Sequence, residues 1–192
     1  MSNCFNIYMA GVGGQGIGLL AETLARAADL AGFAVRGCDT HGLAQRGGIV
    51  SSHLRIGDGA RSPLVEEGSA DLVVALERNE AFRALRTMLA PGGTLLWYDA
   101  SWQPLEVRLR RAAPVETDEV LAEAAARKQR AIRVYDEGLE DPRFQNVSLI
   151  ARISAEGLIP GVDAARYRAA ISQLLDGATL AKNLAVLAAA GA

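Results

Sequence analysis

Four of the six residues from Gly11 to Gly16 are glycine, and this run lies between an apolar stretch and an alanine-rich amphipathic one. Glycine has no Cβ atom to keep a ligand or a second backbone at a distance. Where such a turn leads into a helix, its free amides lie at the positive end of the helix dipole. Gly11, Gly13, Gly14, Gln15 and Gly16 therefore predict a turn that binds an anion or packs closely against another polypeptide.

The residues around this turn alternate between strand and helix patterns. Short apolar stretches predict strands over residues 5–10, 33–37, 49–56, 71–76 and 94–98. Apolar residues at helical spacing predict helices over residues 17–31 and 79–89, which end at Gly32 and at Pro91-Gly92-Gly93. This alternation predicts an α/β fold with a doubly wound, mainly parallel, Rossmann-like sheet.

The last third of the chain predicts helices only. One is expected over residues 117–130 with Thr117 as its N-cap, and another begins at Asp141-Pro142. A break at 157–161 precedes two more, over 162–175 and 180–189. We expect these helices to cover the sheet and to contact a partner, within a single domain that spans residues 1–192.

Charge and hydropathy limit the classes of partner. The formal net charge of the 192-residue chain is −2, whereas nucleic acids and anionic membranes attract a basic excess. No apolar run approaches the roughly 20 residues that cross a bilayer, and residues 1–4 lack the layout of a signal peptide. We therefore expect a cytoplasmic protein that binds neither nucleic acid nor membrane.

Cysteine and histidine are too few for a metal centre. Cys4 and Cys38 are the only cysteines and cannot supply the four ligands of an iron–sulfur cluster; we expect both to be buried packing residues. His53 reads as a packed, hydrogen-bonded residue within a strand. Ser101 and Ser154 have no recognisable base nearby. We expect neither a catalytic residue nor a metal site in this chain.

The glycine spacing leaves three interpretations open. Gly11, Gly13 and Gly16 match the G-x-G-x-x-G pattern, and Asp39 follows about 20 residues later, where a dinucleotide-binding fold places a ribose-binding acid. A free-standing nucleotide- or dinucleotide-binding protein is therefore one reading. A turn that only packs strand against helix is the second. A different ligand or partner at the loop is the third.

A second glycine-flanked segment extends from Asp39 to Gly48, at the carboxyl end of the second predicted strand. Open α/β sheets bind their ligands at this edge. An arginine fork suits phosphate or carboxylate groups, and histidine titrates near neutral pH. The candidate binding residues here are Thr40, His41, Gln45, Arg46, Gly47 and Gly48. They could equally form an ordered loop whose polar groups satisfy one another.

Taken together, the two segments resemble the gamma subunits or gamma domains of the 2-oxoacid:ferredoxin oxidoreductases, which include pyruvate, ketoisovalerate and indolepyruvate enzymes. The likeness is strongest to the small beta subunit of the indolepyruvate branch. It is dense over about the first hundred residues, apart from Asp39-Thr40, where relatives often carry a glutamate, and residues 128–141 do not match well. The matching motifs are Gly11-x-Gly-Gly-Gln-Gly16, Thr40-His-Gly-x-x-Gln-Arg-Gly-Gly48, Ser52-His-Leu-Arg55, Asp71-Leu-Val-Val-Ala-Leu-Glu77 and Pro91-Gly-Gly-Thr-Leu95.

This resemblance implies a division of labour. Thiamine diphosphate, its Mg²⁺ and the iron–sulfur clusters would sit on a larger partner subunit, which decarboxylates a 2-oxoacid, passes electrons to ferredoxin and gives the acyl group to coenzyme A. The present chain would be a non-catalytic subunit, inactive when isolated and then able to form a homodimer. It would close the active-site cleft, and the residues of the two loops would bind coenzyme A or hold the partner's loop.

Overall fold

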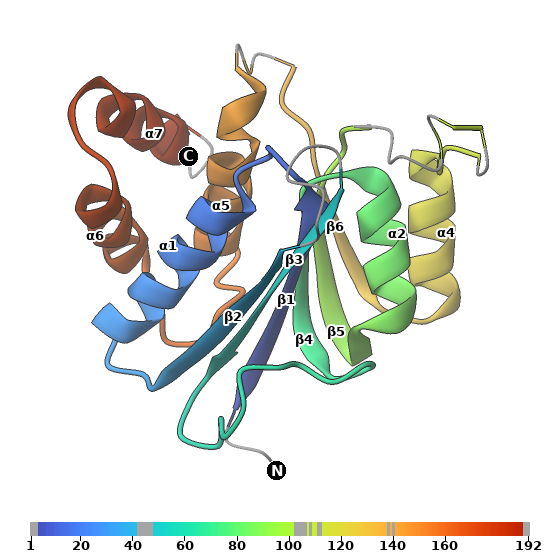
Figure 1. Ribbon diagram of the computed structural model, residues 1–192, viewed down its shortest axis with the longest axis horizontal. Coiled ribbons are helices and arrows are strands. Elements are labelled where there is room, and N and C mark those ends of the chain that lie inside the picture. Colours follow the sequence, from blue (N-terminus) through green and yellow to red (C-terminus); the bar gives the residue numbers. More distant parts are fainter. Residues whose placement is uncertain are drawn as a thin grey trace.

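A six-stranded sheet with helices on both faces forms the centre of the protein (Figure 1). The structure, a computed structural model, describes residues 4–41, 48–101, 107, 109–110, 113–137, 139 and 141–189. The strands are β1 (Phe5–Val12), β2 (Val35–His41), β3 (Ile49–Ile56), β4 (Ala70–Ala75), β5 (Leu89–Tyr98) and β6 (Arg130–Val134). The helices are α1 (Ile17–Leu30), α2 (Arg78–Thr87), α4 (Thr117–Ala126), the 3₁₀ helix η1 (Pro142–Phe144), α5 (Gln145–Ala155), α6 (Ala164–Leu174) and α7 (Gly177–Ala189).

The strand order is β2-β3-β1-β4-β5-β6, and the predicted mainly parallel sheet is confirmed. β1, β4, β5 and β6 pair in parallel, whereas β3 is antiparallel to both β1 and β2. This antiparallel strand was not predicted. Its direction follows from the short connection over residues 42–48, because a parallel crossover needs about a dozen residues or more. β2 therefore still runs in the direction of β1 and ends at the same edge of the sheet.

Alternate residues of the central strands enter two separate cores. On β1, Ile7 and Met9 pack toward α1 and α5, while Tyr8 and Ala10 pack toward α2. Figure 1 shows α1, α5, α6 and α7 on one face of the sheet and α2 and α4 on the other. Because the central strands are covered on both faces, their apolar runs are continuous, as the sequence suggested for residues 71–76.

The C-terminal helices occur where the sequence predicted them, with small shifts at their ends. The buried side chains of α5 include Val147, Leu149, Ile150 and Ile153, which the sequence assigned to its apolar positions. The break at 157–161 is present, and Gly161 adopts a φ of 79° directly beside the ring of Phe33. The predicted covering of the sheet is confirmed for α4 and α5, whereas α6 and α7 pack mainly on α1 and α5 as an outer layer.

Several predicted boundaries were wrong for identifiable reasons. The predicted helix over 79–89 ends at Thr87, and β5 begins at Leu89, so the Pro91-Gly92-Gly93 triplet lies inside a strand. The strand tolerates the triplet because the register between β4 and β5 shifts there and Gly92 has a φ of 78°. β6 was missed because its sequence, RAIRV, interrupts the apolar pattern with two arginines at the edge of the sheet.

Two local predictions also need correction. The N-cap of α4 is Glu116 rather than Thr117, and Glu116 and Glu119 form a reciprocal capping box. Thr117 instead donates its hydroxyl to Asp99, at 2.8 Å. Cys4 is buried as expected, but Cys38 is only half-buried because β2 is an edge strand.

Candidate binding site at the carboxyl edge of the sheet

The two glycine-flanked segments meet at the carboxyl edge of the sheet. The amide of Gly13, in the turn after β1, donates a hydrogen bond to the carbonyl oxygen of Gly48, just before β3, at 2.9 Å. Gly48 closes the second segment, and Thr40 and His41 end β2 at the same edge. Predicted residues Gln45, Arg46 and Gly47 lie outside the described residues, as does the side chain of His41.

Gln15 holds the glycine turn in place from inside. Its side chain is 2% exposed, its Oε1 accepts from the amide of Val12 at 2.7 Å, and its Nε2 donates to the carbonyl of Leu76 at 2.8 Å. The backbone amide of Gln15 also donates to the carbonyl of Val12, at 3.1 Å. Both polar ends of Gln15 are thus engaged within the protein, so this residue shapes the turn rather than offering its side chain to a ligand.

The glycines of the turn are needed for two different reasons. At Gly11, a Cβ would lie 3.0 Å from Gln15 Oε1 and 3.1 Å from the Cβ of Leu76, so the backbone must pass close to its neighbours. Gly14 has a φ of 104°, which favours glycine, and faces open space. Gly14 is exposed, so the outer side of the turn is accessible.

Asn146 is a residue of this edge that the sequence did not reveal. Its Nδ2 donates to the carbonyl of Gly16 at 3.2 Å, and a Cβ on Gly16 would lie only 2.7 Å from that Nδ2. Its Oδ1 accepts from the amide of Val147 at 2.8 Å. Asn146 therefore joins the start of α5 to the start of α1. A polar residue within the buried first turn of an apolar helix was the available signal.

The start of α1 has amides without a helical acceptor and no acidic residue in its first turn. The first helical hydrogen bond runs from the amide of Leu20 to the carbonyl of Gly16, so the amides of Ile17, Gly18 and Leu19 precede the helical pattern. The first turn of α1 contains no acidic residue, and its N-cap, Gly16, has no side chain to occupy these amides. The end of a helix with this composition attracts an anion.

The hydroxyl of Thr40 is engaged with the neighbouring strand. Its Oγ1 donates to the carbonyl of Ser51 at 3.0 Å and lies 2.5 Å from the Ser51 hydroxyl. Asp39, the residue that a dinucleotide-binding fold would use for the ribose, accepts from the hydroxyl of Ser52 at 2.6 Å. β3 separates β2 from β1, so Asp39 is not on a strand next to the glycine turn. The dinucleotide interpretation is not favoured by this arrangement.

The acidic side chains at the ends of β4 and β5 have structural partners. Glu77 is fully buried and caps α2 by accepting from the amides of Asn79 and Glu80; burial raises the pKa of its carboxyl group. Asp99 accepts from Arg78 Nε at 2.7 Å and from Arg133 Nε at 2.5 Å. Although burial alone would raise the pKa of Asp99, its hydrogen bonds to Arg78, Thr117 and Arg133 leave it below the usual value.

His53 is a packed residue, as the sequence indicated. Its Nδ1 accepts from the amide of Val65 at 3.1 Å, and its ring meets the ring of Tyr8 edge-on, with 5.1 Å between the ring centres. Burial lowers its pKa. Within the described ranges, no group of three or more histidine, cysteine, aspartate or glutamate side chains could hold a metal ion. No helix described in this chain is both long and apolar enough to span a membrane.

Comparison with known proteins places these features in a family. The family model described as pyruvate ferredoxin/flavodoxin oxidoreductase matches residues 6–192. The indolepyruvate oxidoreductase subunit IorB of Archaeoglobus fulgidus is 41% identical over 129 residues, which cover 67% of this chain and 63% of that relative. IorB of Methanothermobacter thermautotrophicus is 45% identical over 84 residues, which cover 44% of this chain and 42% of the relative. The matches thus span less than two thirds of these relatives' length.

Solved structures show the same fold at low sequence identity. The pyruvate oxidoreductase subunit PORC of Thermotoga maritima aligns with a TM-score of 0.66 at 19% identity, covering 98% of this chain and 96% of that one. A 2-oxoglutarate:ferredoxin oxidoreductase from Magnetococcus marinus aligns with a TM-score of 0.67 at 16% identity, covering 99% of this chain and 31% of that one. On the evidence of the family model, the chain belongs to the pyruvate ferredoxin/flavodoxin oxidoreductase family.

Proposed function

We propose that this chain is a non-catalytic subunit of a 2-oxoacid:ferredoxin oxidoreductase that acts in the cytoplasm. A larger subunit would carry thiamine diphosphate, Mg²⁺ and iron–sulfur clusters, and the complex would convert a 2-oxoacid such as indolepyruvate or pyruvate to an acyl-coenzyme A, with ferredoxin as the electron acceptor. Family membership and the likeness to IorB and PORC support this role. The carrying observation is the hydrogen bond from the amide of Gly13 to the carbonyl of Gly48, which joins the glycine turn to the end of the second segment.

The glycine turn fits an anionic ligand on the chemistry of its own groups. Gly14 and Gly16 are exposed, no acidic residue lies in the first turn of α1, and the first amides of that helix have no helical acceptor. We propose that these amides, with Gln45 and Arg46 from the adjoining segment, bind the anionic end of coenzyme A or hold a loop of the larger subunit. Coenzyme A accepts the acyl group in such a complex.

The direct test is Arg46→Ala in the complex reconstituted with the larger subunit. We expect assembly to persist, and either the KM for coenzyme A to rise or turnover to fall, because Arg46 supplies a rigid fork of donors to a phosphate or carboxylate. Arg61→Ala is the matched control, because Arg61 is exposed in the segment after β3, at the opposite edge of the sheet. Unchanged kinetics in a fully assembled Arg46→Ala complex would remove the proposed role of this loop.

Isolation of the chain tests the subunit role itself. Alone, it should neither reduce nor bind nicotinamide nucleotides, and it should co-purify with the larger thiamine-diphosphate subunit when the two are expressed together. Light scattering of the isolated chain reports whether it forms the expected homodimer. Nucleotide-dependent oxidoreductase activity of the isolated chain would contradict the proposal.

A further inference from the structure

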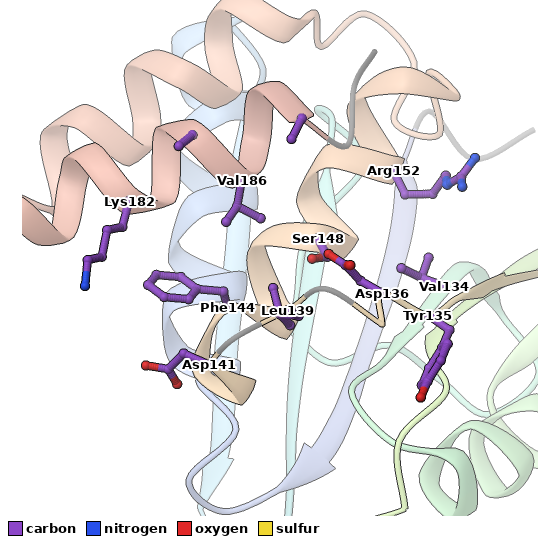
Figure 2. A pocket seen from close by; sticks show the side chains of 12 residues that line it. Val134, Tyr135, Asp136, Leu139, Asp141, Phe144, Ser148, Arg152, Lys182 and Val186 are labelled. Atoms are coloured by element: carbon purple, nitrogen blue, oxygen red, sulfur yellow. The ribbon is translucent and has the colours of Figure 1, made fainter.

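The two edges of the sheet differ in their protection against further strand pairing. β6 is five residues long, carries Arg130 and Arg133, and has α5 beside it. Arg130 is bonded to Glu156, just after α5, at 2.7 Å. Val134 of β6 and Arg152 of α5 line the same cavity, which measures about 830 Å³ (Figure 2). Short length, charged side chains and a helix alongside are means by which proteins keep an edge strand from pairing with another chain.

β2, at the opposite edge, is regular and open. Among the described strands its only neighbour is β3, and the two pair in unbroken register along the whole of β2. The sequence of β2, VRGCDTH, contains no proline. Gly37 is exposed, and because glycine has no side chain, this exposure is that of the main chain. The free edge of β2 is therefore accessible to another strand.

The two charged residues of β2 are both hydrogen-bonded within the chain. Arg36 donates from its Nε to the carbonyl of Ala60, in the segment after β3, at 3.0 Å. The carboxylate of Asp39 accepts from the hydroxyl of Ser52, on β3, at 2.6 Å. Both side chains are thus held toward β3 and its continuation rather than across the free edge.

The hydrogen bonds of β3 show which peptide groups of β2 point outward. The amide of Gly57, directly after β3, donates to the carbonyl of Ala34, directly before β2, at 2.8 Å. Bonded and non-bonded pairs alternate in an antiparallel ladder, so the even-numbered residues of β2 bond to β3. The bond from Gly13 to Gly48 agrees, because it assigns the even-numbered residues of β3 to β1 and leaves the odd-numbered ones for β2. The peptide groups of residues 35, 37, 39 and 41 therefore point away from the sheet.

An antiparallel second copy of β2 fits this edge in one register. A twofold axis perpendicular to the sheet keeps each side chain on its own face, so an odd-numbered residue must lie opposite an odd-numbered one. With the axis at Cys38, Gly37 lies opposite Asp39 of the copy, and all odd-numbered residues from 35 to 41 are paired. An axis at Arg36 or Asp39 would place like charges opposite each other, which is destabilising. An axis at Gly37 would pair fewer of the outward peptide groups.

We propose that the isolated chain dimerises by antiparallel pairing of β2 with β2 of a second copy, about a twofold axis at Cys38. The two sheets become continuous, and the two Cys38 residues form a non-hydrogen-bonded pair with their Cα atoms about 4.5 Å apart. This contact deepens the proposed function, which includes a homodimer of the isolated chain. The subunit role itself is tested separately, by co-purification with the larger subunit, so the two can fail independently.

Gly37→Pro in the full chain tests the pairing. The amide of Gly37 points outward, so proline removes a donor of the dimer without removing a bond to β3, and edge strands accept proline at such positions. Gly37→Ala is the matched control, because it adds a Cβ, 3.4 Å from its nearest neighbour, and keeps the amide. In sedimentation equilibrium up to about 100 µM, the unmodified chain and Gly37→Ala should dimerise and Gly37→Pro should remain monomeric. Circular dichroism confirms that both variants fold.

Oxidation tests the register. Diamide, which takes up the two thiol hydrogens as a disulfide forms, should link two chains through Cys38, because disulfides join Cα atoms about 4.4–6.8 Å apart. Cys38→Ser should abolish the linked dimer, whereas Cys4→Ser should not, because Cys4 is buried. Asp39→Asn should tighten the dimer about 2–5-fold, because the two Asp39 carboxylates are diagonal neighbours in this register and repel each other.

Three results would overturn the proposal: a chain that stays monomeric at about 100 µM, a dimer that Gly37→Pro leaves intact, or a cross-link that forms without Cys38. If the isolated chain is monomeric and Gly37→Pro instead weakens assembly with the larger subunit, a strand of that subunit occupies the edge and self-pairing is wrong.

Discussion

The side-chain amide of Gln15 bridges the turn after β1 and the end of β4, because it donates to the carbonyl of Leu76 at 2.8 Å. Its oxygen accepts from the amide of Val12 within the turn, at 2.7 Å. One buried side chain thereby fixes the position of the glycine turn relative to the neighbouring strand.

Replacement of Gln15 by leucine should destabilise the protein by about 2–4 kcal/mol, since two buried backbone groups would lose their partners. Urea unfolding of the isolated chain measures this difference. Gln173→Ala is the control, because Gln173 is exposed and accepts a 3.3 Å hydrogen bond from Arg26 at the surface. It should change stability by less than about 0.5 kcal/mol. Equal effects of the two substitutions would show that Gln15 does not support the turn.

Gly16 and Gly18, two residues apart, should respond to replacement by alanine with opposite changes in stability. Gly16→Ala should destabilise the protein by about 1–3 kcal/mol, because Gly16 has a φ of 80° and its Cβ would crowd Asn146. Gly18→Ala should stabilise it by about 0.5–1 kcal/mol, because Gly18 is helical and nothing lies within 4 Å of the added atom. Thermal and urea unfolding of both variants distinguish the cases. A neutral Gly16→Ala would contradict the contact with Asn146.

Asp99→Asn should lower the free energy of unfolding by about 2–4 kcal/mol at pH 7, because it removes the carboxylate that forms ion pairs with both Arg78 and Arg133. The folded-state pKa of Asp99 is lowered, so its contribution is present above the unfolded-state value of about 3.9 and is lost as the pH falls through the folded-state value. The difference between the two proteins should therefore shrink below about pH 4. Unfolding free energies measured from pH 7 to pH 3 test this, and a constant difference would contradict it.

Because of His53, the free energy of unfolding of the protein should fall as the pH is lowered from 7 to 5. Burial lowers its folded-state pKa below the unfolded-state value of about 6.5, so the unfolded chain takes up the proton first and stability declines as the pH drops below about 6.5. His53→Gln should reduce this decline between pH 7 and pH 5. An unchanged decline in His53→Gln would contradict the assignment to His53.

The sequence predicted the layers of this fold because the apolar patterns of its central elements are strong. The continuous run over residues 71–76 and the helical spacing after Gly16 both reflect burial that the structure confirms. Direction was harder to predict: the strand pattern of β3 is the same whether it pairs in parallel or antiparallel fashion. β6 carries two arginines at the sheet edge, so its burial is too slight to leave an apolar pattern.

For the candidate site, the sequence predicted which segments meet but not which side chains hold them. The glycine pattern and the expected carboxyl edge were enough to bring Gly13 and Gly48 together. Nothing local shows that Gln15 points inward rather than outward, because a glutamine between glycines is usually polar surface. Asn146 could have been noticed as a polar residue in an apolar helix, but its partner could not be predicted, since Gly16 lies 130 residues earlier in the sequence.

Each hydrogen bond described for the glycine turn has a peptide group on at least one side, such as both groups of the bond between Gly13 and Gly48 and the carbonyl of Leu76. Peptide groups are the same whatever side chains accompany them. Most of the surrounding side chains can therefore change in evolution while the backbone of the glycine turn keeps its shape. That freedom offers a physical reason why proteins sharing only 16–19% of their residues with this chain can superimpose on nearly all of it.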